Sequence, residues 1–190
     1  LHFLVFFMDI SQFIDYLRFQ KRYSEHTLKA YLTDLSEFQN FISSQFELSD
    51  QWNEVTHHMI REWVIKLMEA DVSPRTVSRK LSSLKSFFKY LMKEGEVLSN
   101  PASKVQSPKQ KKKLLRVASE DDLAFLLDHN PFPDDSWGNT QKAILHTFYH
   151  TGIRLSELIG LRVSNLDFTQ NKLTVTGKRN KQRSVPLTPS

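Results

Sequence analysis

The chain has 190 residues, 39% of them hydrophobic and 25% charged, which is ordinary for a globular protein in water. It has no cysteine, which excludes disulfides and cysteine-ligated zinc and fits a reducing, cytoplasmic setting. The apolar start, residues 1–7, is too short to span a bilayer, which takes roughly 20 residues, and lacks signal-peptide features. We therefore expect no membrane role. Met8 resembles a true start, with the residues before it translated upstream; the alternative is that those residues form an extra N-terminal strand or helical turn.

The net charge of +5 is concentrated in two stretches. Residues 99–118 contain six basic residues and no acidic residue, and residues 177–183 contain four basic residues and no acidic residue. The rest of the chain therefore carries a net negative charge. Basic charge clustered in this way is expected of a protein that binds the phosphate backbone of nucleic acids. For the first stretch, a solubilising lysine run in a linker is the alternative.

Four amphipathic helices are predicted between residues 9 and 98, because apolar residues recur there at spacings of three and four. The expected inward faces are Ile10, Phe13, Ile14 and Leu17; Leu28, Tyr31, Leu32, Leu35, Phe38 and Ile42; Ile60, Trp63, Val64, Leu67 and Met68; and Val77, Leu81, Leu84, Phe88 and Leu91. Ser24, Thr56 and Ser73 are candidate N-caps, Pro74 suits a first helical position, and Gly95 ends the fourth helix. Four such helices can form a bundle that leaves one basic face free.

The basic face belongs to the fourth helix. Five cations lie largely off its apolar stripe: Arg75, Arg79, Lys85, Lys89 and Lys93. A solvated polar face explains them without any ligand, and this interpretation stays open beside a binding role.

Residues 99–118 are expected to be a linker between two domains. Pro101, Pro108 and the lysine run 111–113 oppose regular structure. The N-terminal domain then covers residues 9–98, and the C-terminal part covers residues 119–190.

The C-terminal part changes from helices to strands. Ser119 and the acidic residues after it predict a helix start, a second helix covers about residues 140–150 before Gly152, and a third covers 154–161. Leu173 and Val175 alternate with polar residues, a basic turn follows at 177–182, and alternation resumes, which predicts strand, turn, strand. Helices followed by a small antiparallel sheet make this part α+β.

The run from Thr151 to Leu161 contains the most informative arginine. Arg154 lies just after Gly152 at a helix start, and Glu157 is on the same helical side, where it can steady the arginine. A guanidinium held in this way suits a phosphate, because its donors meet two oxygens at once. A surface Arg–Glu pair is the alternative. His146 and His150 have a spacing that permits zinc binding, but no third ligand is evident, so no metal is expected.

This run resembles the first arginine box of the tyrosine recombinases, particularly the Xer-type bacterial enzymes and related phage or transposon integrases. Residues 177–187 resemble the family's hairpin that carries its catalytic lysine. Residues 24–35 resemble the second helix of its core-binding domain, and residues 73–95 with 100–101 and 107–109 resemble its last helix and linker. The resemblance covers nearly everything from Asp9 onward.

The resemblance implies a fold that is mainly α and then α+β: a four-helix SAM-like core-binding domain, then the first part of the catalytic domain. It implies that Arg154 clamps the scissile phosphate, that Lys178 protonates the departing 5′ oxygen, and that Glu157 supports Arg154. A tyrosine would form a 3′-phosphotyrosyl link, so no metal or other cofactor is expected.

Double-stranded DNA is the partner that the resemblance implies, bound by a homo- or heterotetramer of the complete protein. The candidate DNA contacts are Ser24, Thr27, Lys29, Arg75, Arg79, Lys85, Lys111, Lys112, Lys113 and Arg179. The target sequence, and the choice between chromosome-dimer resolution and mobile-element integration, stay open at this point.

The chain also departs from the family pattern. The family's His-x-x-Arg box and tyrosine nucleophile follow the hairpin, and residues 1–190 contain neither after it. The chain alone is therefore expected to bind DNA without cleaving it. A catalytically inactive DNA-binding remnant or regulator is the alternative function, and a helical protein–protein module with a basic linker is a third.

Overall fold

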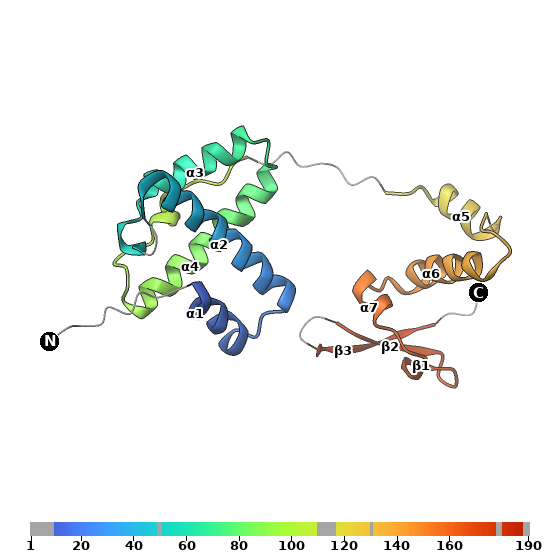
Figure 1. Cartoon of the computed structure of the whole chain (residues 1–190). Coiled ribbons are helices and arrows are strands. Elements are labelled where there is room, and N and C mark those ends of the chain that lie inside the picture. The colour runs from blue at the N-terminus through green and yellow to red at the C-terminus, as the bar shows by residue number, and fades with distance from the viewer. Residues whose placement is uncertain (1–9, 49–50, 110–116, 130, 178–179, 188–190) are drawn as a thin grey trace. The chain divides into compact units, whose positions relative to one another are not determined.

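The computed structural model describes residues 10–48, 51–109, 117–129, 131–177 and 180–187 (Figure 1). The chain divides into two compact units, residues 1–113 and residues 114–190. Within the described ranges, no helix is both long enough and apolar enough to cross a membrane.

The described part of the N-terminal unit has the expected helices. They are α1 (Ile10–Asp15), α2 (Glu25–Phe46), α3 (His57–Glu69) and α4 (Pro74–Glu94), with a π-helical turn at Tyr16–Gln20 and a 3-10 turn at Trp52–Glu54. Thr56 and Ser73 cap α3 and α4 by accepting backbone N–H groups. Ser24 is at the N-cap of α2, but its hydroxyl lies 2.9 Å from the hydroxyl of Thr27 and caps no amide. Gly95 ends α4 in the left-handed conformation that favours glycine.

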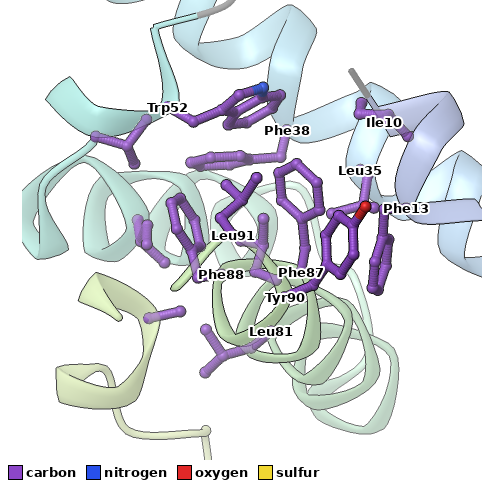
Figure 2. Close-up of a cluster of buried hydrophobic side chains, with 14 of the residues drawn as sticks. Ile10, Phe13, Leu35, Phe38, Trp52, Leu81, Phe87, Phe88, Tyr90 and Leu91 are labelled. Atoms are coloured by element: carbon purple, nitrogen blue, oxygen red, sulfur yellow. The ribbon is translucent and has the colours of Figure 1, made fainter. Parts of the chain in front are cut away.

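The core of this unit is built on α4 and is rich in aromatic rings (Figure 2). The ring of Phe87 lies 4.8 Å from that of Trp52 and 5.3 Å from that of Phe13, both edge to face. Two expectations of the apolar pattern were wrong, because Leu32 and Met68 are exposed. Each lies at the edge of the apolar stripe of its helix, next to positions that face solvent.

Part of the expected linker packs onto this unit. Residues Pro101–Lys104 form a 3-10 turn, and Ala102 and Val105 are buried in the same core as the four helices. The side-chain amide of Asn100 donates to the carbonyl of Lys85 at 2.9 Å. Burial of Ala102 and Val105 therefore fixes the first part of the 99–118 stretch on this unit. The proline and lysine content of the stretch did not predict this packing.

A buried polar network joins α2 to α4. Asp34 is fully buried, and it accepts hydrogen bonds from Ser83 at 2.8 Å and from the side chains of Arg79 and Lys80. Lys80 also pairs with Glu37, and its side chain is only 7% exposed. The guanidinium-bearing side chain of Arg79 is 48% exposed. Because a buried charge needs a partner, this network fixes how the two helices lie against each other.

The C-terminal unit places helices before a small sheet. Its described elements are α5 (Glu120–Asp128), α6 (Ser136–Thr151), α7 (Leu155–Ile159), a 3-10 turn (Val163–Asn165), β1 (Leu166–Asp167), β2 (Lys172–Thr176) and β3 (Gln182–Pro186). The strands are antiparallel in the order β1–β2–β3. This arrangement confirms the predicted mainly α, then α+β, fold class.

Two details of this unit differ from the expectation. Helix α6 begins before Thr140, because the Asp135 carboxylate accepts the N–H of Gly138 at 2.7 Å and caps the helix there. The short strand β1 was not expected, since two residues are too few to show alternation.

We expect the core of the N-terminal unit to be sensitive to the loss of a ring from α4. Phe88→Ala should lower the free energy of unfolding by about 3–5 kcal/mol, because Phe88 is fully buried. Phe19→Ala removes an equally large but exposed ring and should change it by about 0.5 kcal/mol or less. Urea unfolding followed by the fluorescence of the buried Trp52 and Trp63 measures both. Equal losses in the two variants would contradict this packing.

We also expect the two acids that contact Lys80 to differ in their contribution. Asp34→Ala should cost about 3–5 kcal/mol, because it leaves Lys80 buried beside no remaining buried carboxylate. Glu37→Ala removes a half-exposed partner and should cost about 1 kcal/mol or less. The same urea titration compares them, and a larger loss for Glu37→Ala would show that Asp34 does not hold the network together.

Candidate functional site

The junction of α6 and α7 presents one arginine to solvent. Gly152 ends α6 with a left-handed φ of +59°, which turns the chain sharply. Ile153 is buried with Leu173 and Val175 of β2 and anchors the turn. Arg154 follows in an extended conformation as the N-cap residue of α7, and its side chain is 70% exposed. The sequence therefore fixes the backbone on both sides of this guanidinium.

Glu157 is the buried acid of the site, with a side chain only 1% exposed. Its carboxylate accepts four hydrogen bonds. Two come from Arg154, through the backbone N–H at 2.8 Å and Nη1 at 2.9 Å. Two come from Arg183, through Nη1 at 2.6 Å and Nη2 at 2.8 Å.

These bonds lower the pKa of Glu157 to about 2, chiefly through the bond from Arg183 and then the backbone N–H of Arg154, although desolvation opposes the shift. The carboxylate is therefore charged at every pH at which the protein is expected to work.

The β2–β3 hairpin lies directly against this carboxylate. The N–H of Gly177 donates to the carbonyl of Lys181 at 2.7 Å and closes the end of the hairpin. A Cβ placed on Gly177 would lie 3.1 Å from Oε1 of Glu157, so the glycine permits a close approach. Lys178 and Arg179, which follow Gly177, lie outside the described residues. The structure thus brings Arg154 and the turn end of this hairpin together at Glu157.

The arrangement can bind an anion. Arg154 uses its backbone N–H and Nη1 on Glu157, and an arginine has five side-chain N–H donors in all. The remaining donors of this exposed side chain suit two oxygens of one phosphate. Donors held in advance at such a place stabilise negative charge that develops there.

No metal site accompanies the arginine: in the part of the chain that the structure describes, no group of three or more His, Asp or Glu side chains is arranged to hold an ion. His146 and His150 stack on α6 with their ring centroids 5.8 Å apart.

The candidate DNA contacts of the N-terminal unit are spread along α2 and α4. Ser24 and Lys29 are exposed and Thr27 is half-buried near the start of α2, whereas Arg75 is exposed in the first turn of α4 and Lys85 is half-buried farther along it. Arg79 is half-exposed and bound to Asp34. The remaining candidates, Lys111, Lys112 and Lys113, lie outside the described residues, as does Arg179.

The contacts between α2 and α4 show that these helices run antiparallel. Tyr31 pairs with Ser86, Asp34 with Ser83, and Glu37 with Lys80. The start of α2, with Ser24 and Thr27, therefore lies toward the C-terminal half of α4, and Arg75 lies toward the opposite end. The candidates are therefore spread along the helix pair and do not form one cluster.

Sequence reasoning missed two residues that organise these surfaces. Asp34 lies three residues after Tyr31 and four before Phe38, so its helical phase places it on the apolar face of α2. Arg183 lies two residues before Val185 and four before Leu187, so its strand phase places it on the inward side. A charged residue in phase with apolar neighbours was the available signal in both cases.

Family models match both parts of the chain. Residues 10–95 match the phage integrase N-terminal SAM-like domain, and residues 116–190 match the phage integrase family. The tyrosine recombinase XerC of Natranaerobius thermophilus is 40% identical over 179 residues, which cover 94% of this chain and 59% of that protein. The XerC of Thermodesulfovibrio yellowstonii is 41% identical over 178 residues, covering 94% and 57%. The chain thus spans less than two thirds of the length of these relatives.

Solved structures share the fold. A lambda integrase tetramer bound to a Holliday junction superposes with a TM-score of 0.73 at 14% identity, covering 95% of this chain and 50% of that one. A lambda integrase (75–356) dimer bound to a COC′ core site gives a TM-score of 0.71 at 15% identity, covering 93% and 60%. The two matched domains and the XerC relatives, with the fold in agreement, show that this chain belongs to the tyrosine recombinase family.

Proposed function

We propose that this chain acts in site-specific DNA recombination, binding duplex DNA and contributing Arg154 and Lys178 to strand exchange in the complete protein. The observation that carries the proposal is the exposed guanidinium of Arg154, held at the start of α7 by the buried Glu157. The XerC relatives are tyrosine recombinases, and they supply the reaction class.

Arg154 has the role of a phosphate clamp in this proposal. Its free donors bind two non-bridging oxygens of the scissile phosphate, where negative charge builds as the phosphorus is attacked. Glu157 keeps the guanidinium in place before DNA arrives, so little reorganisation is needed when the reaction begins.

Lys178 has the role of general acid, and it gives a proton to the departing 5′ oxygen. It follows Gly177, which lies at the turn end of the hairpin beside Glu157. A tyrosine of the complete protein attacks the phosphorus and forms the 3′-phosphotyrosyl link, and the other DNA end leaves as a free 5′ hydroxyl. This exchange conserves the phosphate ester, so it needs neither a metal ion nor a nucleotide cofactor.

The N-terminal unit and the basic stretches supply affinity in the proposed complex. Arg75, Arg79, Lys85 and the start of α2 contact phosphates along the helix pair, and the lysines of 111–113 add further phosphate contacts. The lambda integrase structures with the same fold are bound to DNA, one of them as a tetramer on a Holliday junction. We therefore infer double-stranded DNA as the partner and a homo- or heterotetramer as the working form of the complete protein, acting in the cytoplasm.

Binding by the 190-residue chain should be strongly salt-dependent. The logarithm of the association constant should fall linearly with that of the salt concentration, and Arg75→Gln should reduce the slope by about 0.9, the value for one lost phosphate contact. Lys66→Gln removes an exposed cation from α3, where it binds Gln45, and should leave the slope unchanged. Fluorescence anisotropy with a labelled duplex measures both slopes. A salt-independent affinity, or none, would favour the protein–protein alternative.

The same 190 residues should bind DNA without becoming covalently attached to it. Tyr16, Tyr31 and Tyr90 pack in the aromatic core region of the N-terminal unit, Tyr23 also belongs to that unit, and Tyr149 lies on α6 before the Gly152 turn. A nicked suicide duplex, analysed under denaturing conditions, should therefore give no protein–DNA adduct. An adduct that disappears in Tyr149→Phe would instead identify Tyr149 as a nucleophile.

A further inference from the structure

Arg183 projects to the inward side of the small sheet although it is charged. In the β2–β3 register, Arg183 lies opposite Val175 and Val185 lies opposite Leu173. Val175 and Leu173 are buried, and residues two apart on a strand share a side. A cation placed in phase with these apolar residues needs an acidic partner, because an unpaired charge in such surroundings is unfavourable.

That partner is Glu157, 26 positions earlier in the chain. The two guanidinium nitrogens of Arg183 reach the two carboxylate oxygens separately, at 2.6 Å and 2.8 Å, which is the paired-fork geometry of the strongest Arg–carboxylate contacts. The side chain of Arg183 is 42% exposed, whereas that of Glu157 is almost fully buried. The contact therefore ties β3 to α7 through the least exposed group of the site.

The contact also decides where the positive charge of the site resides. One carboxylate faces two arginines, so the three side chains carry a net charge of +1. Arg183 has both of its terminal nitrogens on Glu157, while Arg154 spends only Nη1 of its side chain there and is much more exposed. The bond from Arg183 is also the largest cause of the low pKa of Glu157. The uncompensated charge thus lies at Arg154.

We propose that Arg183 is a positioning residue for Arg154: it neutralises Glu157 and fastens the β2–β3 hairpin to the start of α7, so that Arg154 meets a phosphate with its full positive charge. The identity of the anion rests on the proposed function. The Arg183–Glu157 clamp, by contrast, rests only on the contacts among these three residues.

Gly177 fits the same arrangement. A Cβ at this position would lie 3.1 Å from Oε1 of Glu157 and 3.7 Å from Nη1 of Arg183. The first distance is tighter than an ordinary contact, so a larger residue would push on the carboxylate that both arginines share. The absence of a side chain at Gly177, just before Lys178, therefore leaves room for the contact between Arg183 and Glu157.

The first test measures the effect of Arg183 on the pKa of Glu157 in the absence of DNA. Carboxyl ¹³C NMR of the full 190-residue chain should give a pKa for Glu157 of about 2, and Arg183→Gln should raise it toward the ordinary value of 4.5. Because folding lowers this pKa, the clamp stabilises the protein fully above pH 4.5, and the stabilisation is lost as the pH falls toward 2.

Two variants make this measurement decisive. Arg183→Lys keeps the charge but loses the fork, and should give an intermediate pKa, which also covers the case in which Arg183→Gln does not fold. Lys172→Gln removes another cation from the same sheet, one that binds Gln170, and should leave the pKa of Glu157 unchanged. An unchanged pKa in both Arg183 variants would overturn the proposal.

The second test asks whether Arg183 acts through Arg154 or touches DNA itself. Arg154→Gln should reduce the salt slope of duplex binding by about 0.9, and Arg183→Gln should do the same, because Arg154 then forms a neutral pair with Glu157. The double variant Glu157→Gln/Arg183→Gln should restore the slope, since it frees the charge of Arg154. A slope that stays reduced in the double variant would contradict the neutralisation of Glu157 as the role of Arg183, and the proposal would be wrong.

The two tests separate failure of the inference from failure of the proposed function. If the chain does not bind duplex DNA, or if Arg154→Gln leaves the salt slope unchanged, the proposed function fails, and the phosphate part of the inference falls with it. The titration of Glu157 then decides alone whether Arg183 neutralises this carboxylate.

Discussion

The C-terminal unit depends on one buried carboxylate that is shared by two arginines. Burying Glu157 removes its hydration, so its oxygens need donors within the protein, and they accept four hydrogen bonds from two arginines. This requirement sets the distance between α7 and β3, and the adjacent Gly177 leaves room for it. The small apolar core around Ile153 would leave these elements freer to shift, because it contains few buried side chains.

The N-terminal unit uses the same device at a different scale. Asp34 is fully buried and holds Arg79, whose side chain remains half-exposed, much as Glu157 holds the exposed Arg154. Here a large aromatic core also holds the helices together, and the buried acid both joins α2 to α4 and holds a surface arginine. In both units a buried carboxylate holds an arginine whose side chain remains largely or half exposed. An arginine oriented in advance loses less side-chain entropy when it meets an anion.

Most of the fold could be predicted because the apolar periodicity and the capping residues indicate where helices and strands lie. Thr56, Ser73 and Ser119 cap helices where expected, and Gly95 and Gly152 end them. The errors arose where tertiary contacts outweigh local pattern. Proline and lysine content predicts a linker after Ser99, but a few apolar side chains at the start of that stretch find room in the core. The edges of apolar stripes were also misassigned, because periodicity gives the direction of a face and not the width of the surface that will cover it.

The site could be predicted only in part, for a related reason. The spacing of Arg154 and Glu157 is local, so a contact between them follows from helix geometry. The contact between Glu157 and Arg183 joins a helix to a strand, and no spacing rule connects residues that far apart in sequence. What the sequence does contain is a conflict: Arg183 is a charged residue in the phase of an apolar one. Such a conflict predicts a buried partner without naming it, and in this protein the partner is the same carboxylate that holds Arg154. The residue that breaks the pattern of the strand is thus the one that leaves the site with a net positive charge.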